Sequence, residues 1–227
     1  MSFAELLIPD EQELAEHYPS RVEKTVDGWV HAVGMLAAVI GGGVLVAVAL
    51  TNRGVPMATA SAIYALCLMA MLAASAVYNL SKPNQQRRIL RRIDEAAIFL
   101  MIAGSYTPFT MKLLPPEFAL FATVAIWIAA LSGAAGKVLW PQLSDRAWCV
   151  IYLAFGWLAV FVLGPAVPTL PPLAIGLLVV AGVTYSAGVL LYLNHALPFR
   201  RALWHACVIL GAAGHYGAIL VGLVLPG

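Results

Sequence analysis

The stretch PLAIGLLVVAGVTYSAGVLLYL, residues 172–193, contains no acidic or basic side chain. A helix needs roughly 20 mostly apolar residues to cross the hydrocarbon core of a bilayer, so this stretch predicts a membrane-spanning helix. The whole chain has the same character, because 62% of its 227 residues are apolar and only 11% are charged. A soluble domain carries about 25% charged residues. The sequence therefore predicts an integral membrane protein.

Seven segments reach the spanning length when the chain is divided at its clusters of charged residues, prolines and asparagines. Their approximate bounds are 29–51, 57–79, 94–113, 118–138, 147–167, 172–193 and 202–225. The fifth ends among Pro165, Pro168, Pro171 and Pro172, which we interpret as a short turn outside the hydrocarbon, where a missing N–H group costs little. We predict an all-α fold with a cytoplasmic N-terminal segment, residues 1–28, and a seven-helix membrane domain, residues 29–227.

The basic residues predict the orientation of the bundle. Eleven of the thirteen lysines and arginines fall at alternate loops, beginning with the N-terminal side, and only Arg53 and Lys112 fall on the opposite side. Cytoplasmic loops carry the excess of Lys and Arg. We therefore expect a multi-pass protein of the plasma membrane with a cytoplasmic N-terminus and an external C-terminus.

Composition also excludes several classes of function. A net charge of +2 does not suit a nucleic-acid binder that relies on a basic face. The three cysteines, Cys67, Cys149 and Cys207, lie inside apolar runs without a CxxC pair, which excludes a disulfide framework and a zinc finger. An aqueous pore needs a polar stripe along several helices, whereas predicted helices four to six are almost wholly apolar.

Six polar residues fall at one predicted membrane level, at the inner ends of helices two, three and seven: Ser75, Asn79, Asp94, Glu95, Arg201 and His205. Ionisable groups at membrane depth need partners and mark candidate functional sites. Ser75 and Asn79 are four residues apart, and so are Arg201 and His205, so each pair lies on one helix face. The two faces and a carboxylate can close on one another. Each residue also has a local explanation, such as a favourable anion at a helix N-terminus for Asp94.

Four blocks of sequence resemble the hemolysin III family, which belongs with the progestin and adiponectin receptors. They are EKTVDGWVHAVG at 23–34, SAVYN at 75–79, LRRIDEAAIFLMIAGSYTPF at 90–109 and LPFRRALWH at 197–205. The resemblance implies seven helices, an internal N-terminus and a zinc ion near the cytoplasmic face. In the family, one histidine four residues after the helix-two serine and two histidines at the start of helix seven bind the metal. A helix-three aspartate contacts the zinc-bound water, and ceramidase-like hydrolysis is the implied chemistry.

The sequence departs from this pattern at two of the three ligand positions. Ser75, Asp94 and His205 match, but Asn79 and Arg201 stand where the family has histidines. Asn is a poor zinc ligand and a guanidinium repels a cation, so His205 is the one surviving metal ligand of that set. We expect no cofactor, with zinc as an alternative.

Arg201 has two alternative positions. It can point inward and pair with Asp94 in place of the metal, or it can extend to the cytoplasm and leave Asp94, Glu95 and His205 to bind a metal with new ligands. His31 and His215 match family histidines that are not zinc ligands. We expect both to be interhelical hydrogen-bond partners, and neither to replace a missing ligand.

These observations favour a non-catalytic protein of membrane homeostasis or lipid sensing, with a degenerate zinc site. A zinc-dependent lipid amide or ester hydrolase is the first alternative, and a pore-forming cytolysin is the second. Whether the chain is an enzyme stays open at this point. The expected partners are membrane lipids, including a small lipid ligand, and not nucleic acid.

Overall fold

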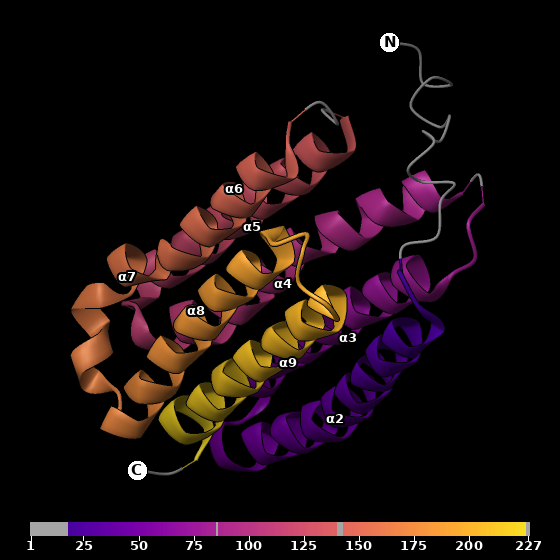
Figure 1. Ribbon diagram of the computed structural model, residues 1–227. Coiled ribbons are helices and arrows are strands. Elements are labelled where there is room, and N and C mark those ends of the chain that lie inside the picture. Colours follow the sequence, from indigo (N-terminus) through magenta and orange to yellow (C-terminus); the bar gives the residue numbers. More distant parts are fainter. Residues whose placement is uncertain (1–17, 85, 140–142, 226–227) are drawn as a thin grey trace.

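The computed structural model describes residues 18–84, 86–139 and 143–225, and the regular structure of this part of the chain is entirely helical (Figure 1). Seven helical segments are long and apolar enough to cross a membrane. They are α2 (Arg21–Arg53), α3 (Val55–Leu80), α4 (Arg87–Leu113), α5 (Pro116–Leu139), α6 (Asp145–Trp157) continued by α7 (Ala159–Val162), α8 (Pro172–Leu193), and α9 (Arg200–Ile219) continued by the π-helical turn η3 (Leu220–Val224). The predicted all-α architecture with seven spans is confirmed.

Two helices extend further into charged sequence than predicted. Helix α2 begins at Arg21 rather than at residue 29, and α4 begins at Arg87 rather than at 94. The start of α2 is capped by Ser20, whose hydroxyl accepts a hydrogen bond from the Glu23 N–H at 3.2 Å, and the Ser-x-x-Glu spacing is typical of a helix N-terminus. Hydropathy therefore marks where a helix meets lipid, not where it ends. The predicted N-terminal segment 1–28 loses its last turns to α2, and residues 1–17 lie outside the described part.

The proline-rich stretch is more ordered than a short turn. Pro165 and Pro168 lie within a 3₁₀ helix, η2 (Gly164–Thr169), which follows α7. Pro171 precedes α8, and Pro172 is its first residue, where the missing N–H has no helical partner to lose. The prolines thus lie in a short 3₁₀-helical connection between α7 and α8.

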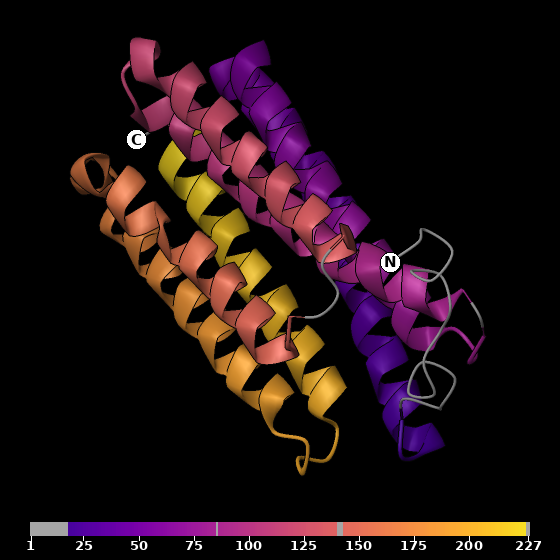
Figure 2. The same ribbon diagram turned by 90° about the horizontal axis from the view of Figure 1, so that it is seen from above.

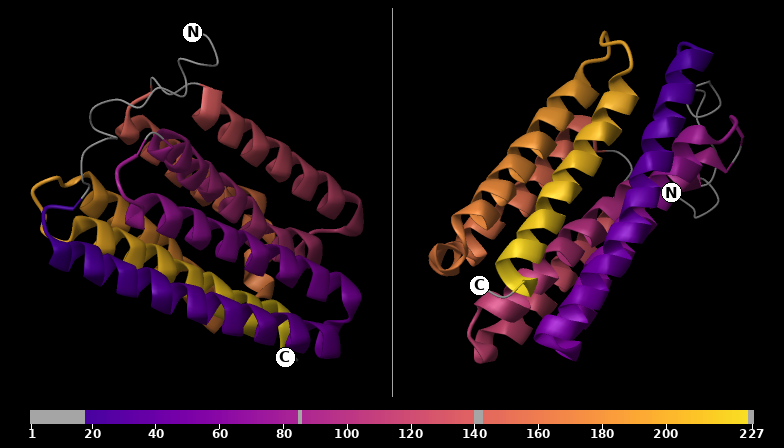
Figure 3. Two further views of the ribbon diagram at one scale, coloured as in Figure 1. Left: turned by 90° about the vertical axis from the view of Figure 1, so that its right-hand side faces the viewer. Right: turned by 90° about the horizontal axis from the view of Figure 1, so that it is seen from below.

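The helices form a ring, and most helices that follow one another in the chain pack side by side. Helix α2 packs against α3 and α9, α3 against α4, and α8 against α9, while α6 contacts both α4 and α8 and closes the ring (Figures 2 and 3). Helix α5 packs mainly on α4. Close approach of α2 and α3 depends on Gly42, because a Cβ there would lie 2.9 Å from the Cβ of Ala65. Large apolar side chains such as Phe121, Phe161 and Leu190 point outward and are exposed, as expected for lipid contact.

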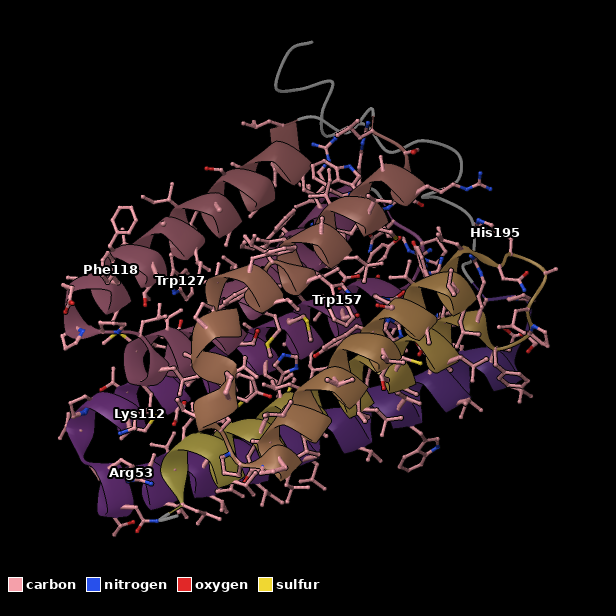
Figure 4. The ribbon with its side chains drawn as sticks, turned by 90° about the vertical axis from the view of Figure 1, so that its left-hand side faces the viewer. Arg53, Lys112, Phe118, Trp127, Trp157 and His195 are labelled. Carbon is pink, nitrogen blue, oxygen red and sulfur yellow. The ribbon has the colours of Figure 1, made fainter. Side chains whose placement is uncertain are left out.

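The two ends of the bundle differ in charge. Figure 4 shows Arg53 and Lys112 at one end and His195 at the opposite end. Arg53 there donates from Nε to the carbonyl oxygen of Val224 at 3.2 Å, which ties the end of α2 to η3. The other eleven basic residues lie in or beside the starts of α2, α4, α6 and α9 and the ends of α3 and α5. These helix ends lie toward the same end of the bundle as the loop between α8 and α9 (Figure 1), so the charge asymmetry used to predict orientation is present in three dimensions. The side of the membrane that each end faces stays a prediction.

Candidate functional site

The six polar residues singled out from the sequence lie on the wall of one cavity near the His195 end of the bundle. Ser75 and Asn79 are in the last turns of α3, Asp94 and Glu95 are in α4, and Arg201 and His205 are in the first turns of α9. All six line a cavity of about 210 Å³. The i, i+4 spacing therefore does place both pairs on faces that meet across α3 and α9.

A histidine cluster, which we define as Asp27, His31, Ser75 and His205, lies at the junction of α2, α3 and α9. His205 Nδ1 lies 2.7 Å from Oδ1 of Asp27. His31 Nδ1 lies 2.9 Å from the backbone carbonyl oxygen of Asp27. The Nε2 atoms of both histidines lie 3.3 Å from Ser75 Oγ, and the centroids of the two imidazole rings are 4.3 Å apart. All four residues are buried.

The partners of these atoms fix where the ring protons are. A carbonyl oxygen only accepts, so His31 Nδ1 must carry its proton, and the Asp27 carboxylate assigns the same tautomer to His205. Both Nε2 atoms then turn lone pairs toward Ser75. The serine hydroxyl has one proton to donate, and it also accepts from Asn79 Nδ2 at 3.3 Å. When both imidazoles are neutral, Ser75 can donate its proton to only one of the two Nε2 atoms. The other Nε2 atom accepts no hydrogen bond from Ser75.

Asp27 is fully buried, and both of its carboxylate oxygens accept a hydrogen bond. Oδ1 faces His205, and Oδ2 accepts from the Tyr18 hydroxyl at 2.5 Å. Burial raises the pKa of the Tyr18 phenol well above its usual value, and the neighbouring Asp27 charge raises it further, so the phenol stays a donor. The sequence interpretation missed Asp27 and Tyr18. Asp27 precedes His31 by one helical turn, and this spacing could have identified it.

Arg201 turns inward but does not pair directly with Asp94. Its Nη1 donates to Oδ1 of Asn79 at 2.9 Å, and Nδ2 of Asn79 lies 3.5 Å from Oδ2 of Asp94. No ion pair within 4.0 Å joins Arg201 and Asp94, both of which belong to the described residues. The direct pair expected from the sequence is wrong, because the Asn79 amide lies between the two charges and hydrogen-bonds to both.

Glu95 belongs to a separate charge network at the ends of α4, α5 and α6. Its carboxylate lies 2.6 Å from Lys137 Nζ and 3.1 Å from Arg91 Nε, and Arg91 also binds Asp145 at 2.8 Å. Lys137 lies over the ring of Trp148 as well. Among the described residues, the group with metal-ligand proximity is Asp27, His31 and His205. The alternative set of Asp94, Glu95 and His205 does not assemble.

The two other histidines of the helix interior have different roles. His31 makes the expected interhelical contact, through Ser75, and it also lies beside His205. His215 instead bonds to the carbonyl oxygen of Gly211 in its own helix at 3.2 Å, so the interhelical role expected for it is wrong.

The zinc position implied by the resemblance does not fit the residues present. Asn79 and Arg201 occupy two of its three ligand positions, and they hydrogen-bond to each other. A guanidinium keeps its proton in proteins and repels a metal cation. Of that ligand set, His205 alone offers a nitrogen lone pair.

The remaining arrangement has a chemical capability of its own. Ser75, His205 and Asp27 form a continuous series of hydroxyl, imidazole and carboxylate. An imidazole held by a carboxylate on one side can accept a proton from a hydroxyl on the other, which is how a serine is activated as a nucleophile. Ser75 and His205 line the cavity, whereas Asp27 lies behind them.

Comparisons with known proteins give one consistent result. The family description "Haemolysin-III related" matches residues 20–216 of the chain. Hemolysin-3 of Bacillus cereus is 26% identical over 90% of this chain and 93% of its own length. The Hemolysin-3 homolog of Bacillus subtilis (strain 168) is 28% identical over 70% of this chain and 74% of its own length.

A mammalian relative is also similar. Monocyte to macrophage differentiation factor of Homo sapiens is 29% identical over 69% of this chain and 67% of its own length. No solved structure gives a significant match. The family match covers most of the chain, including all the residues of the cavity wall named above. The chain therefore belongs to the haemolysin-III-related family of membrane proteins.

Proposed function

We propose that this chain is a non-catalytic membrane protein that senses a lipid and serves membrane homeostasis, and that its family zinc site is degenerate. The observation that carries the proposal is the hydrogen bond between Arg201 and Asn79 on the cavity wall. Arg201 and Asn79 stand where the family has two metal-binding histidines. The Asn79 side chain accepts from Arg201 and lies 3.5 Å from the Asp94 carboxylate, so it connects the two charged groups. The polar cavity is kept, while the residues needed for family-type zinc hydrolysis are lost.

The lining of the cavity supports a lipid as the ligand. Arg201 lines the cavity, and its Nε has no hydrogen-bond partner among the described residues, so it can donate to a headgroup. Met71, Leu72, Ile98 and Val208 give the same cavity an apolar side that suits the first carbons of an acyl chain. A ligand with a polar end and an apolar chain satisfies both kinds of wall.

The test uses protein in nanodiscs, with tritiated ceramide and tritiated phosphatidylethanolamine as probes. We expect saturable binding of one of them without release of fatty acid. Val208→Trp places an indole in the cavity and should reduce binding at least tenfold. Val183→Trp, on an exposed face of α8, is the matched control and should bind like the wild type. Equal binding by wild type and Val208→Trp would overturn the proposal.

Lipid amide or ester hydrolysis is the second candidate, and the Ser75–His205–Asp27 series is the observation that favours it. Release of fatty acid by wild type, lost in Ser75→Ala and in Asp27→Asn, would establish it and reject the non-catalytic role. The pore-forming alternative has less support, since the polar side chains of the cavity wall gather near one end of the bundle instead of following its length.

A further inference from the structure

We propose that the histidine cluster binds a divalent cation of the zinc class. His31 and His205 bind it through their Nε2 atoms, Ser75 Oγ is the third ligand, and Asp27 orients both imidazoles from behind. This position lies between α2, α3 and α9. It shares His205 with the ligand set implied by the family, but uses His31 and Ser75 in place of the residues at positions 79 and 201. It goes beyond the proposed lipid-sensing function and does not depend on it.

The first argument is the shortage of hydrogen-bond donors. Both Nδ1 atoms donate to Asp27, so both Nε2 atoms present lone pairs, and Ser75 has a single proton for the two of them. A cation between the three atoms satisfies all of their lone pairs at once. Histidine Nε2 is a common ligand for zinc and for related transition metals.

The second argument is distance. Both Nε2 atoms lie 3.3 Å from Ser75 Oγ, which is longer than the usual 2.5–3.0 Å or 2.7–3.2 Å of protein hydrogen bonds. Ligands at about 2.0–2.1 Å from a tetrahedral zinc ion are separated by about 3.3–3.4 Å along the edges of the tetrahedron. The two distances from Ser75 Oγ therefore match the separations between ligands of one ion. The fourth position can be filled by water from the cavity that Ser75 and His205 line.

The third argument is the arrangement behind the ligands. Metal-binding histidines generally donate the proton of their other ring nitrogen to a carboxylate or a backbone carbonyl, which fixes the tautomer and the ring orientation. Asp27 supplies both kinds of acceptor, its carboxylate to His205 and its carbonyl oxygen to His31. The Tyr18 hydroxyl in turn holds the other carboxylate oxygen of Asp27. Both carboxylate oxygens of Asp27 therefore have hydrogen-bond partners. Asp27 holds the ligands in place and is not itself a ligand.

Charge is also compatible with a bound cation. Asp27 contributes a negative charge directly behind His205, 2.7 Å from its Nδ1, and Arg201 contributes a positive charge one helical turn away. The Arg201 guanidinium is turned toward Asn79. A divalent ion is therefore partly neutralised by its surroundings, and it links α2, α3 and α9 through one ligand from each.

Metal binding to the full chain in detergent, stripped with chelator and dialysed, tests the proposal. Titration with Co²⁺ should give the intense visible absorption of a tetrahedral complex, and Zn²⁺ should displace it at one ion per chain. His31→Ala and His205→Ala should each weaken binding more than tenfold, and Asp27→Asn should weaken it 10- to 100-fold as an outer partner. His215→Ala, which removes another histidine of the helix interior, should bind like wild type.

Two results would overturn the proposal. The first is wild-type protein that binds no Co²⁺ or Zn²⁺ at micromolar free concentration, a result that requires no variant to fold. The second is His31→Ala that keeps wild-type affinity while His205→Ala loses it, because the ion would then occupy a position without α2. Lipid binding is measured separately, so failure here leaves the proposed function to its own test.

Discussion

Replacing Arg201 by alanine tests whether the hydrogen bond from its guanidinium to Asn79 stabilises the fold. The Nη1 donor lies 2.9 Å from Asn79 Oδ1, and hydrogen bonds that involve a charged group contribute about 1.5–3 kcal/mol to stability. Arg201 is half-buried, so we expect Arg201→Ala to lower the free energy of unfolding by about 2 kcal/mol. For a chain of this length, that corresponds to a fall of about 4–8 °C in Tm.

A double-mutant cycle isolates the contact itself. Asn79→Ala also removes the amide that lies between Arg201 and Asp94, and the double variant Arg201→Ala with Asn79→Ala should be milder than the sum of the two by about 1–2 kcal/mol. Thermal unfolding in detergent, followed by circular dichroism, provides the measurement. Arg200→Ala is the matched control, because Arg200 donates to the carbonyl oxygen of Tyr192 and should be additive with Asn79→Ala. Additivity of Arg201 and Asn79 would refute the reasoning and make Arg201 an interfacial anchor.

Three further predictions follow from packing, charge and topology. Gly42→Ala should lower Tm because the new Cβ would meet Ala65 at 2.9 Å, whereas Gly43→Ala, with open space around it, should leave Tm unchanged or higher; equal effects would show that α2 and α3 can separate without cost. Lys137→Ala should destabilise the fold by about 1 kcal/mol because it removes a buried cation 2.6 Å from half-buried Glu95, which keeps Arg91 as its other partner. Lys112→Ala, near the opposite end, should change the free energy of unfolding by less than about 0.5 kcal/mol. Cysteine labelling should find residues 81–86 in the cytoplasm and the C-terminus outside, and a cytoplasmic C-terminus would reject the predicted orientation.

Sequence predicted the number of helices well because the apolar runs are long and the charged residues are few. The run at 172–193 coincides with α8 at both ends. Prediction was weaker for α2 and α4, which continue as helices through charged turns such as that from Arg21 to Lys24. In these turns the chain is helical but is not apolar enough to lie in lipid. Hydropathy detects contact with lipid and does not detect helix formation.

The candidate site was predicted in part, and its missing members have a physical explanation. Spacing along one helix identified the faces of Ser75 with Asn79 and of Arg201 with His205, because i and i+4 positions are adjacent whatever the tertiary fold. The partner of Arg201 depends on the rotation of α9 against α3 and α4, which spacing does not determine. Asp27 was not among the candidate residues, although α2 buries it completely.

Zinc stoichiometry in one pair of variants tests most directly whether Asn79 and Arg201 are what make the family zinc site degenerate. His31→Ala removes the helix α2 ligand of the proposed cation site, and His31→Ala with Asn79→His and Arg201→His adds the three-histidine set of the family beside His205. We predict that His31→Ala, purified and equilibrated with buffered micromolar zinc, holds little zinc, and that the triple variant holds about one ion per chain, in the open three-ligand geometry of such sites. Stoichiometric zinc in His31→Ala alone, or none in the triple variant, would contradict the account.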